Sequence, residues 1–337
     1  MVDGIFYFGG RIKVNVYKQF EISVYRTMRG RGALICETDK GIKLLRETVC
    51  REEKYAKEDY ITAKLKENGM AYVDTFVRNV DGNIIAEDED KKRYYLKDWF
   101  EAAELDVRNY QMVMGACRAI ACVHNALNKI EIMDDVGFCI NSAQDETEKF
   151  QKKIKEMKTI RNYLKKKKGK NDFERTAYEQ IEKYIGEGVK TLCDMEDIGY
   201  TSIHNKACEK KTLIHGSCNH HNILGTKGYM ALVNYERTQV SLQISDLYNF
   251  MRKILEKYNW DIKLAYKMID EYNREKTIGT DDIKALYCMF SFPEKFFKIM
   301  NHYYNSSKAW MADKDIEKLY NVINQNEARL RFVESLK

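Results

Sequence analysis

Hydrophobic and polar positions alternate along the first hundred residues, and short turn sequences interrupt the alternation. A period of two is typical of β-strands. It predicts strands at Phe20–Met28, Ala33–Glu37, Ile42–Arg46, Tyr72–Arg78, Asn83–Ala86 and Tyr94–Trp99. One helix is predicted among them, Arg51–Glu67, because Asn68-Gly69 supplies the signal that ends a helix. Strands around a single helix indicate a small α+β lobe.

Two short sequences predict hairpin turns within this lobe. Arg29-Gly30-Arg31-Gly32 separates the first two strands, and Asp81-Gly82 lies between Tyr72–Arg78 and Asn83–Ala86. Glycine after asparagine, aspartate or arginine allows the positive φ angles that tight hairpins need. We therefore expect an antiparallel pair of strands on either side of each turn.

Beyond residue 106 the apolar positions recur at helical spacing, for example at Met112, Cys117 and Ile120. Glycines and β-forming residues interrupt this rhythm once, at Leu213–Val233. The pattern predicts helices at Val107–Leu127, Asp145–Lys168, Asp172–Met195, Leu247–Tyr258, Ile262–Arg274, Asp281–Phe290, Glu294–Tyr304 and Asp315–Leu336. We expect an N-lobe over residues 1–99 and a helical C-lobe over 100–337, in which residues 145–195 form a helical hairpin.

Composition and charge narrow the classes of function. Of 337 residues 44% are hydrophobic, which fits a folded protein, and no stretch approaches the ~20 apolar residues that cross a bilayer. The net charge is only +6 and the basic run Lys165–Lys168 ends a predicted helix, so nucleic-acid binding is disfavoured. The nine cysteines include no C-x-x-C pair, and the N-terminus has no export signal. These features favour reduced cysteines in a cytosolic protein.

The interruption at Leu213–Val233 carries the most unusual local sequence. It contains His215-Gly216-Ser217, then His220-His221-Asn222, and is followed by Asn234-Tyr235-Glu236. The spacing of the three histidines matches no usual zinc arrangement. No G-x-S-x-G elbow surrounds Ser217, which disfavours a hydrolase. Two polar loops that follow short strands instead indicate a ligand-binding site.

These loops resemble the H-G-D-x-x-x-x-N and D-F-D motifs of aminoglycoside phosphotransferases and of the CotS-like spore-coat family. The resemblance extends to Arg29–Gly41 in the N-lobe, to Tyr95–Glu101 as the hinge between lobes, to Asp246–Lys253 and to Pro293–Phe296. Because it spans nearly the whole chain, it implies a bilobal, kinase-like α+β fold, with residues 213–237 as the catalytic-loop-like segment.

Mapped onto this sequence, the resemblance implies a set of site residues. Ser217 stands where the family has its catalytic Asp, and His215 braces that loop. Asn222, Asn234 and Glu236 are the candidate metal ligands, with Asn234 in the place of the metal-binding Asp. The candidate cofactor-binding residues are Arg46 (in place of the strand-three lysine), Glu58 (as its partner on the N-lobe helix), Arg29 and Arg31 in the glycine turn, and Trp99 in the hinge.

The departures from the family pattern support a pseudokinase. A serine hydroxyl is a poor general base, and hard divalent cations favour carboxylates over amides. Two hypotheses follow. The first is a non-catalytic, structural or interaction protein whose inter-lobe cleft serves either as a scaffold or as a sensor for ATP or ADP, with little affinity for Mg²⁺. The second is an active ATP-dependent small-molecule phosphotransferase, in which Asn222 and Glu236 carry Mg²⁺.

The resemblance also implies a place in the cell. A CotS-like protein is expected in the cytoplasm of the mother cell and in the spore coat, where its partners would be other spore coat proteins. The basic hairpin over residues 145–195 is a candidate contact surface for them. The sequence gives no indication of an acceptor substrate.

Overall fold

The computed structural model describes residues 15–132, 140–226, 228–305 and 312–337. Over these residues it divides into two compact units. The first comprises residues up to 141 together with 213–239, and the second comprises 142–212 together with 240–337. The prediction of a lobe boundary at residue 99 concerns a different division of the chain, and it stays a prediction.

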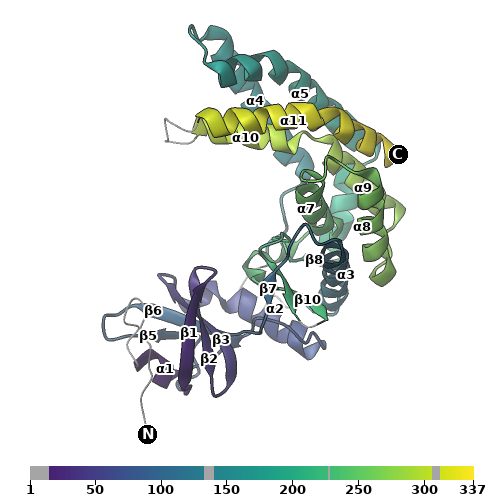
Figure 1. Cartoon of the computed structure of the whole chain (residues 1–337). Helices are drawn as coiled ribbons and strands as arrows, with labels where there is room; N and C mark the ends of the chain where they lie inside the picture. Colours follow the sequence, from purple (N-terminus) through teal and green to yellow (C-terminus); the bar gives the residue numbers. More distant parts are fainter. Residues whose placement is uncertain (1–14, 133–139, 227, 306–311) are drawn as a thin grey trace. The chain divides into compact units, whose positions relative to one another are not determined.

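The first unit is built on a six-stranded antiparallel sheet in the order β1-β2-β3-β6-β4, with β5 also paired to β6 (Figure 1). Its elements are α1 (Asn15–Gln19), β1 (Val24–Gly30), β2 (Ala33–Thr38), β3 (Gly41–Thr48), η1 (Glu52–Lys54), α2 (Ala56–Glu67), β4 (Phe76–Val77), β5 (Ile85–Glu87), β6 (Arg93–Asp98), β7 (Ala103–Glu104), α3 (Tyr110–Leu127), β8 (Leu213–Ile214), β9 (Ile223–Thr226), β10 (Tyr229–Leu232) and η2 (Tyr235–Arg237). The predicted α+β class is confirmed.

The first predicted hairpin is confirmed and the second is wrong. β1 and β2 pair across Arg31-Gly32, and both turn residues have positive φ angles, 58° and 68°. In contrast, β4 and β5 do not pair with each other, because each pairs with a different part of β6. The Asn79 side chain closes the turn between them by accepting hydrogen bonds from the backbone of Asp81 and Asn83.

Two apolar clusters hold this sheet to its surroundings. One contains Phe20, Leu45 and Leu96, on the face that α1 covers. The other contains Leu44, Trp99, Leu224 and Val233, and so connects β3 with the three-stranded sheet β10-β9-β7. Burial of such side chains contributes about 1.5–3 kcal/mol each. The second cluster matters for function, because it fixes the position of the chain at Asn234, directly after Val233.

The second unit is helical. Its elements are α4 (Glu146–Lys166), α5 (Asp172–Asp197), α6 (Tyr200–Glu209), α7 (Ile244–Leu255), α8 (Ile262–Glu275), α9 (Thr280–Ser291), α10 (Glu294–Asn305) and α11 (Ala312–Ser335), while β11 (Gln239–Val240) crosses the boundary between units. The predicted hairpin of α4 and α5 is confirmed, and α10 and α11 lie beside it (Figure 1). Asn171 caps α5 with a complete capping box, which sets the start of that helix.

Most predicted helices are confirmed, with two omissions. The sequence patterns did not predict α1 and α6. α1 is only five residues long, and α6 follows α5 after two residues, Ile198 and Gly199, of which Gly199 has φ 68°. His124 in α3 is buried, as are Phe290 of α9 and Phe296 of α10. Among the residues that the structure describes, no helix combines the length and apolar character needed to span a bilayer.

Candidate functional site

Two residues set the conformation of the catalytic-loop-like segment: Gly216 allows its close approach to the backbone of Arg237, and His215 connects it to a neighbouring strand. Gly216 has φ 76°, and a Cβ placed there would lie 2.2 Å from the backbone oxygen of Arg237. His215 is fully buried; its Nδ1 accepts from the backbone N–H of Ser217 at 3.2 Å, so Nε2 donates to the carbonyl of Val233 at 3.1 Å. The segment that begins at His215 is thereby tied to the strand that leads to Asn234.

Three predicted site residues, Ser217, Asn222 and Asn234, come together through their side chains. Nδ2 of Asn222 donates to the carbonyl oxygen of Ser217 and to its hydroxyl, both at 3.0 Å. A carbonyl can only accept, so this contact fixes the amide orientation of Asn222 and turns its Oδ1 toward Asn234. Nδ2 of Asn234 donates to that oxygen at 2.8 Å. An amide–amide hydrogen bond therefore joins the two positions that the sequence suggested as metal ligands.

Asn234 adopts the left-handed backbone conformation, with φ 67° and ψ 69°. Asparagine tolerates this region better than most residues. Glu236, two residues later, is exposed, and its charge acts on Lys54, Lys57 and Glu58 in and beside α2. It makes no hydrogen bond to Asn222 or Asn234. The predicted metal ligands Asn222 and Asn234 thus lie together, and Glu236 shares no hydrogen bond with them.

The expected pair between Arg46 and Glu58 does not form. Nη2 of Arg46 donates to the carbonyl oxygen of Arg31 in the glycine turn at 2.8 Å. Glu58 accepts from Nζ of Lys97 at 2.6 Å, and Lys97 also donates to Asp74 at 2.9 Å. The register between β3 and β6 explains this difference. Lys97 of β6 is paired with Leu44 of β3, and from this position its side chain contacts α2. Arg46 lies two residues farther along β3, and from there its side chain contacts the glycine turn.

Lys97, Glu58 and Asp74 form a buried charge cluster that the sequence reasoning missed. Their side chains are 4%, 7% and 0% exposed. Burial alone would lower the pKa of Lys97, but the charges of Asp74 and Glu58 outweigh it and raise that pKa. Burial and the negative charge of Asp74 raise the pKa of Glu58, against the opposing effect of Lys97. One ammonium group serves two carboxylates here.

The glycine turn contacts the catalytic-loop-like segment directly. Nη1 of Arg31 donates to Glu104 at 3.0 Å, and Nη2 donates to the carbonyl oxygen of His221. The guanidinium carbon lies 5.8 Å from the ring centre of Trp99, whose indole is buried and stacked on Phe100. Glu104 also lies 3.2 Å from Nδ1 of His221. Arg31 and Trp99 are therefore engaged with the protein itself, while Arg29 is exposed on β1.

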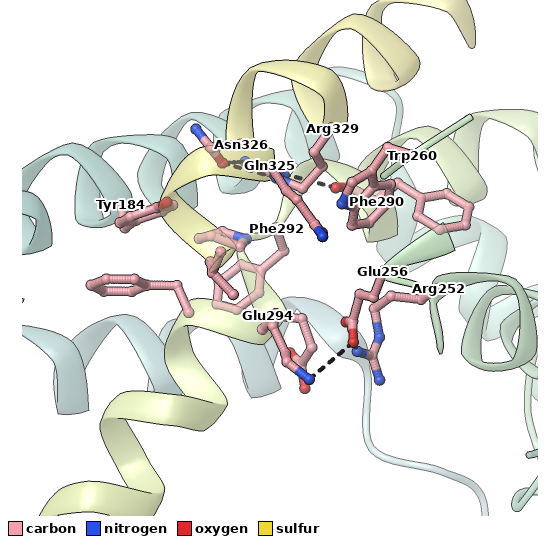
Figure 2. A pocket seen from close by; sticks show the side chains of 14 residues that line it. Tyr184, Arg252, Glu256, Trp260, Phe290, Phe292, Glu294, Gln325, Asn326 and Arg329 are labelled. Atoms are coloured by element: carbon pink, nitrogen blue, oxygen red, sulfur yellow. Dashed lines mark hydrogen bonds and ion pairs between the residues drawn. The ribbon is translucent and has the colours of Figure 1, made fainter. Parts of the chain in front are cut away.

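A cavity lies among the helices of the second unit, where Asn326 and Arg329 of α11 lie near Phe290 and Trp260 (Figure 2). Its volume of about 20 Å³ is enough for one water molecule but not for a substrate. Arg329 is buried and donates to the carbonyl oxygens of Phe290 at 3.0 Å and Ser291 at 2.9 Å. This cavity is a feature of packing, and the candidate functional site is the cluster in the first unit.

The chain is similar to one known protein family and to several solved structures. A family model described as spore coat putative kinase YutH matches residues 13–336. Among solved structures, an aminoglycoside phosphotransferase from Alicyclobacillus acidocaldarius is 16% identical, covers 98% of this chain and 96% of its own, and superposes with a TM-score of 0.82. A spectinomycin phosphotransferase bound to AMP is 8% identical, with coverages of 94% and 96% and a TM-score of 0.62.

A microcompartment-associated aminopropanol kinase is also similar, at 11% identity, with coverages of 94% and 93% and a TM-score of 0.55. Identities this low show the fold alone, which is the kinase-like fold of aminoglycoside phosphotransferases. None of the curated proteins matches the chain.

Proposed function

This chain belongs to the spore coat putative kinase YutH family, and from that membership we propose that it is a non-catalytic kinase-fold protein with a structural or interaction role in the spore coat. Its partners would be other spore coat proteins, and it would be made in the cytoplasm of the mother cell. The family description supports the coat, and the state of the site supports the absence of catalysis.

The observation that carries the proposal is the amide–amide hydrogen bond between Asn222 and Asn234. Mg²⁺ prefers carboxylate oxygens in octahedral geometry, and neither residue has one. Oδ1 of Asn222 already accepts a hydrogen bond from Nδ2 of Asn234, so a metal ion would have to share that oxygen with the N–H group or displace it. The residues present do not fit a magnesium site. ATP or ADP would then bind without metal.

Ser217 supports the same conclusion about proton transfer. Its hydroxyl accepts from Asn222 at 3.0 Å, and its carbonyl oxygen accepts from Asn219 at 2.9 Å. A general base contributes about 10²–10⁴-fold to a rate when its pKa is near the working pH, and a serine hydroxyl is far from that range. Ser217 therefore acts as a hydrogen-bonding element of the loop.

The alternative, an active phosphotransferase with Mg²⁺ on Asn222 and Glu236, is less well supported. The exposed carboxylate of Glu236 acts on the lysines of the α2 region. No contact of the described residues brings the two side chains together.

The hairpin of α4 and α5 is the proposed surface for coat partners. The last turn of α4 and the connection to α5 together carry five lysines, at positions 165–168 and 170. Lys167 pairs with Glu174 at 2.5 Å, and Lys170 donates to the carbonyl oxygen of Lys167 at 2.7 Å. Lys165, Lys166 and Lys168 remain to offer positive charge at the tip. An acidic segment of a coat protein would complement it.

Fractionation of mature spores from a host that carries this gene tests the coat assignment. We expect the protein in the detergent-extractable coat fraction, both as wild type and as the N222A/E236A double variant, because assembly needs no turnover. A variant with Lys165, Lys166 and Lys168 replaced by glutamate is expected to fall at least severalfold in that fraction. Recovery of the wild-type protein only from the spore core, or loss of the N222A/E236A variant from the coat at normal expression, would contradict the proposal.

A further inference from the structure

The lysine that contacts Glu58 in the candidate site, Lys97, lies on β6 and not on β3, where the resemblance predicts the basic residue. Partners across an antiparallel pair place their side chains on one face of the sheet. Lys97 is paired with Leu44, and the neighbouring pair is Arg46 with Tyr95. Lys97 and Arg46 therefore share the face that meets α2, but only Lys97 contacts Glu58. The ion pair between a sheet lysine and the helix has moved from β3 to β6.

Asp74 binds both Lys97 and the backbone of the loop at Asn234. Its Oδ2 accepts from Nζ of Lys97 at 2.9 Å and from the backbone N–H of Asn234 at 3.1 Å. The other oxygen, Oδ1, is buried and has no hydrogen-bond partner among the described residues. Leaving a buried acceptor unsatisfied costs about 1–3 kcal/mol. Packing alone does not explain a carboxylate in this place.

An anion between a lysine and the loop at Asn234 is what a bound nucleotide provides in proteins of kinase-like fold, where lysine and loop meet the phosphates. Asp74 offers an oxygen with the same charge and the same two donors. It is part of the chain, so it competes at an effectively high local concentration.

We infer that Asp74 is a built-in anion that occupies the phosphate position beside Lys97, and that a nucleoside diphosphate or triphosphate binds only when Asp74 is displaced. This inference rests on the proposed function, because it concerns the same metal-free site. It adds the residue that determines whether nucleotide binds. Asp74 acts here by competition and takes no part in chemistry.

The test measures binding of ADP, in EDTA, by thermal melting of the full-length protein. Asp74→Asn retains an acceptor for Lys97 and Asn234 but removes the charge, and we expect its apparent Kd for ADP to fall at least about tenfold below that of the wild type. The D74N/K97M double variant is expected to lose that gain. Asp98→Asn is the matched control, since Asp98 also binds lysines, Lys43 and Lys66, but does not contact Glu58.

Equal ADP binding by wild type and D74N, or a gain that survives in the double variant, would overturn the inference. If D74N does not fold, Asp74→Ser provides the same comparison with a smaller acceptor. Failure of the proposed function is distinct, because it would appear as ADP binding to the wild type that occurs only when the EDTA is replaced by Mg²⁺.

Discussion

Replacing Lys97 by methionine is expected to lower the free energy of unfolding by about 3–5 kcal/mol, because the change leaves two buried carboxylates without their counter-charge. Methionine is close to lysine in volume, so packing against Phe76, whose ring centre lies 4.5 Å from the ammonium, is largely retained. The loss is thus electrostatic. Urea unfolding followed by circular dichroism measures it.

The pH dependence identifies the cause. Without Lys97, burial and the negative charge of Asp74 raise the folded-state pKa of Glu58 further above its unfolded value, because the opposing charge of Lys97 is gone. A raised pKa gives stability that is present below the unfolded pKa and lost as pH rises through the folded pKa. The deficit of K97M should therefore shrink between pH 8 and pH 5.

The matched control for this variant is Lys66→Met. Lys66 also pairs with a carboxylate, Asp98, at 3.1 Å, but its side chain is 58% exposed. An exposed pair contributes less than about 1 kcal/mol. If K97M and K66M had equal effects, or if the K97M deficit did not change with pH, the buried cluster would not be the source of stability.

Gly216→Ala is the second change with a large expected effect. The positive φ costs a non-glycine residue about 1–2 kcal/mol. In addition, the new Cβ would lie 2.2 Å from the carbonyl oxygen of Arg237, which is backbone and cannot rotate away. Relief of an overpacked contact costs about 1–3 kcal/mol more. We expect a total loss of about 2–5 kcal/mol in urea unfolding.

Gly228→Ala separates the two causes. Gly228 has φ 84°, and nothing lies within 4 Å of a Cβ built there, so only the conformational cost applies. G216A should be less stable than G228A by at least about 1 kcal/mol. Equal losses would mean that the loop at Gly216 moves away from Arg237 without cost.

The fold could be predicted from the sequence because period-two and helical patterns are strong in most elements. The errors arose where local signals carry no pairing information. Asp81-Gly82 correctly predicts a turn. Only the strand pairing shows that β4 and β5 pair with successive segments of β6 and not with each other. Likewise α6 follows α5 so closely that periodicity alone does not separate them.

The candidate site was predictable in part. The resemblance of two loops brought Ser217, Asn222 and Asn234 together, as the structure does. The resemblance predicted Arg46 of β3 as the basic partner of Glu58, whereas the structure has Lys97 of β6 there. Motif spacing compares positions along one strand, so it cannot identify a residue on the neighbouring strand. A signal was present in the sequence: Lys97 follows Tyr94-Tyr95-Leu96, and Asp74 follows Tyr72-Val73. Charged residues in apolar runs are rarely buried unless they are paired.

The central claim is that Asn222 and Asn234 bind each other in place of a metal ion. Its most direct test is urea unfolding of the wild type and of Asn234→Asp, with ATP, in millimolar MgCl₂ or NaCl of equal ionic strength. Two oxygens would face each other in N234D, so we expect it to be about 1–3 kcal/mol less stable and to recover with Mg²⁺. The wild type should be equally stable in both salts. Stabilisation of the wild type by Mg²⁺ beyond that by NaCl would contradict the account.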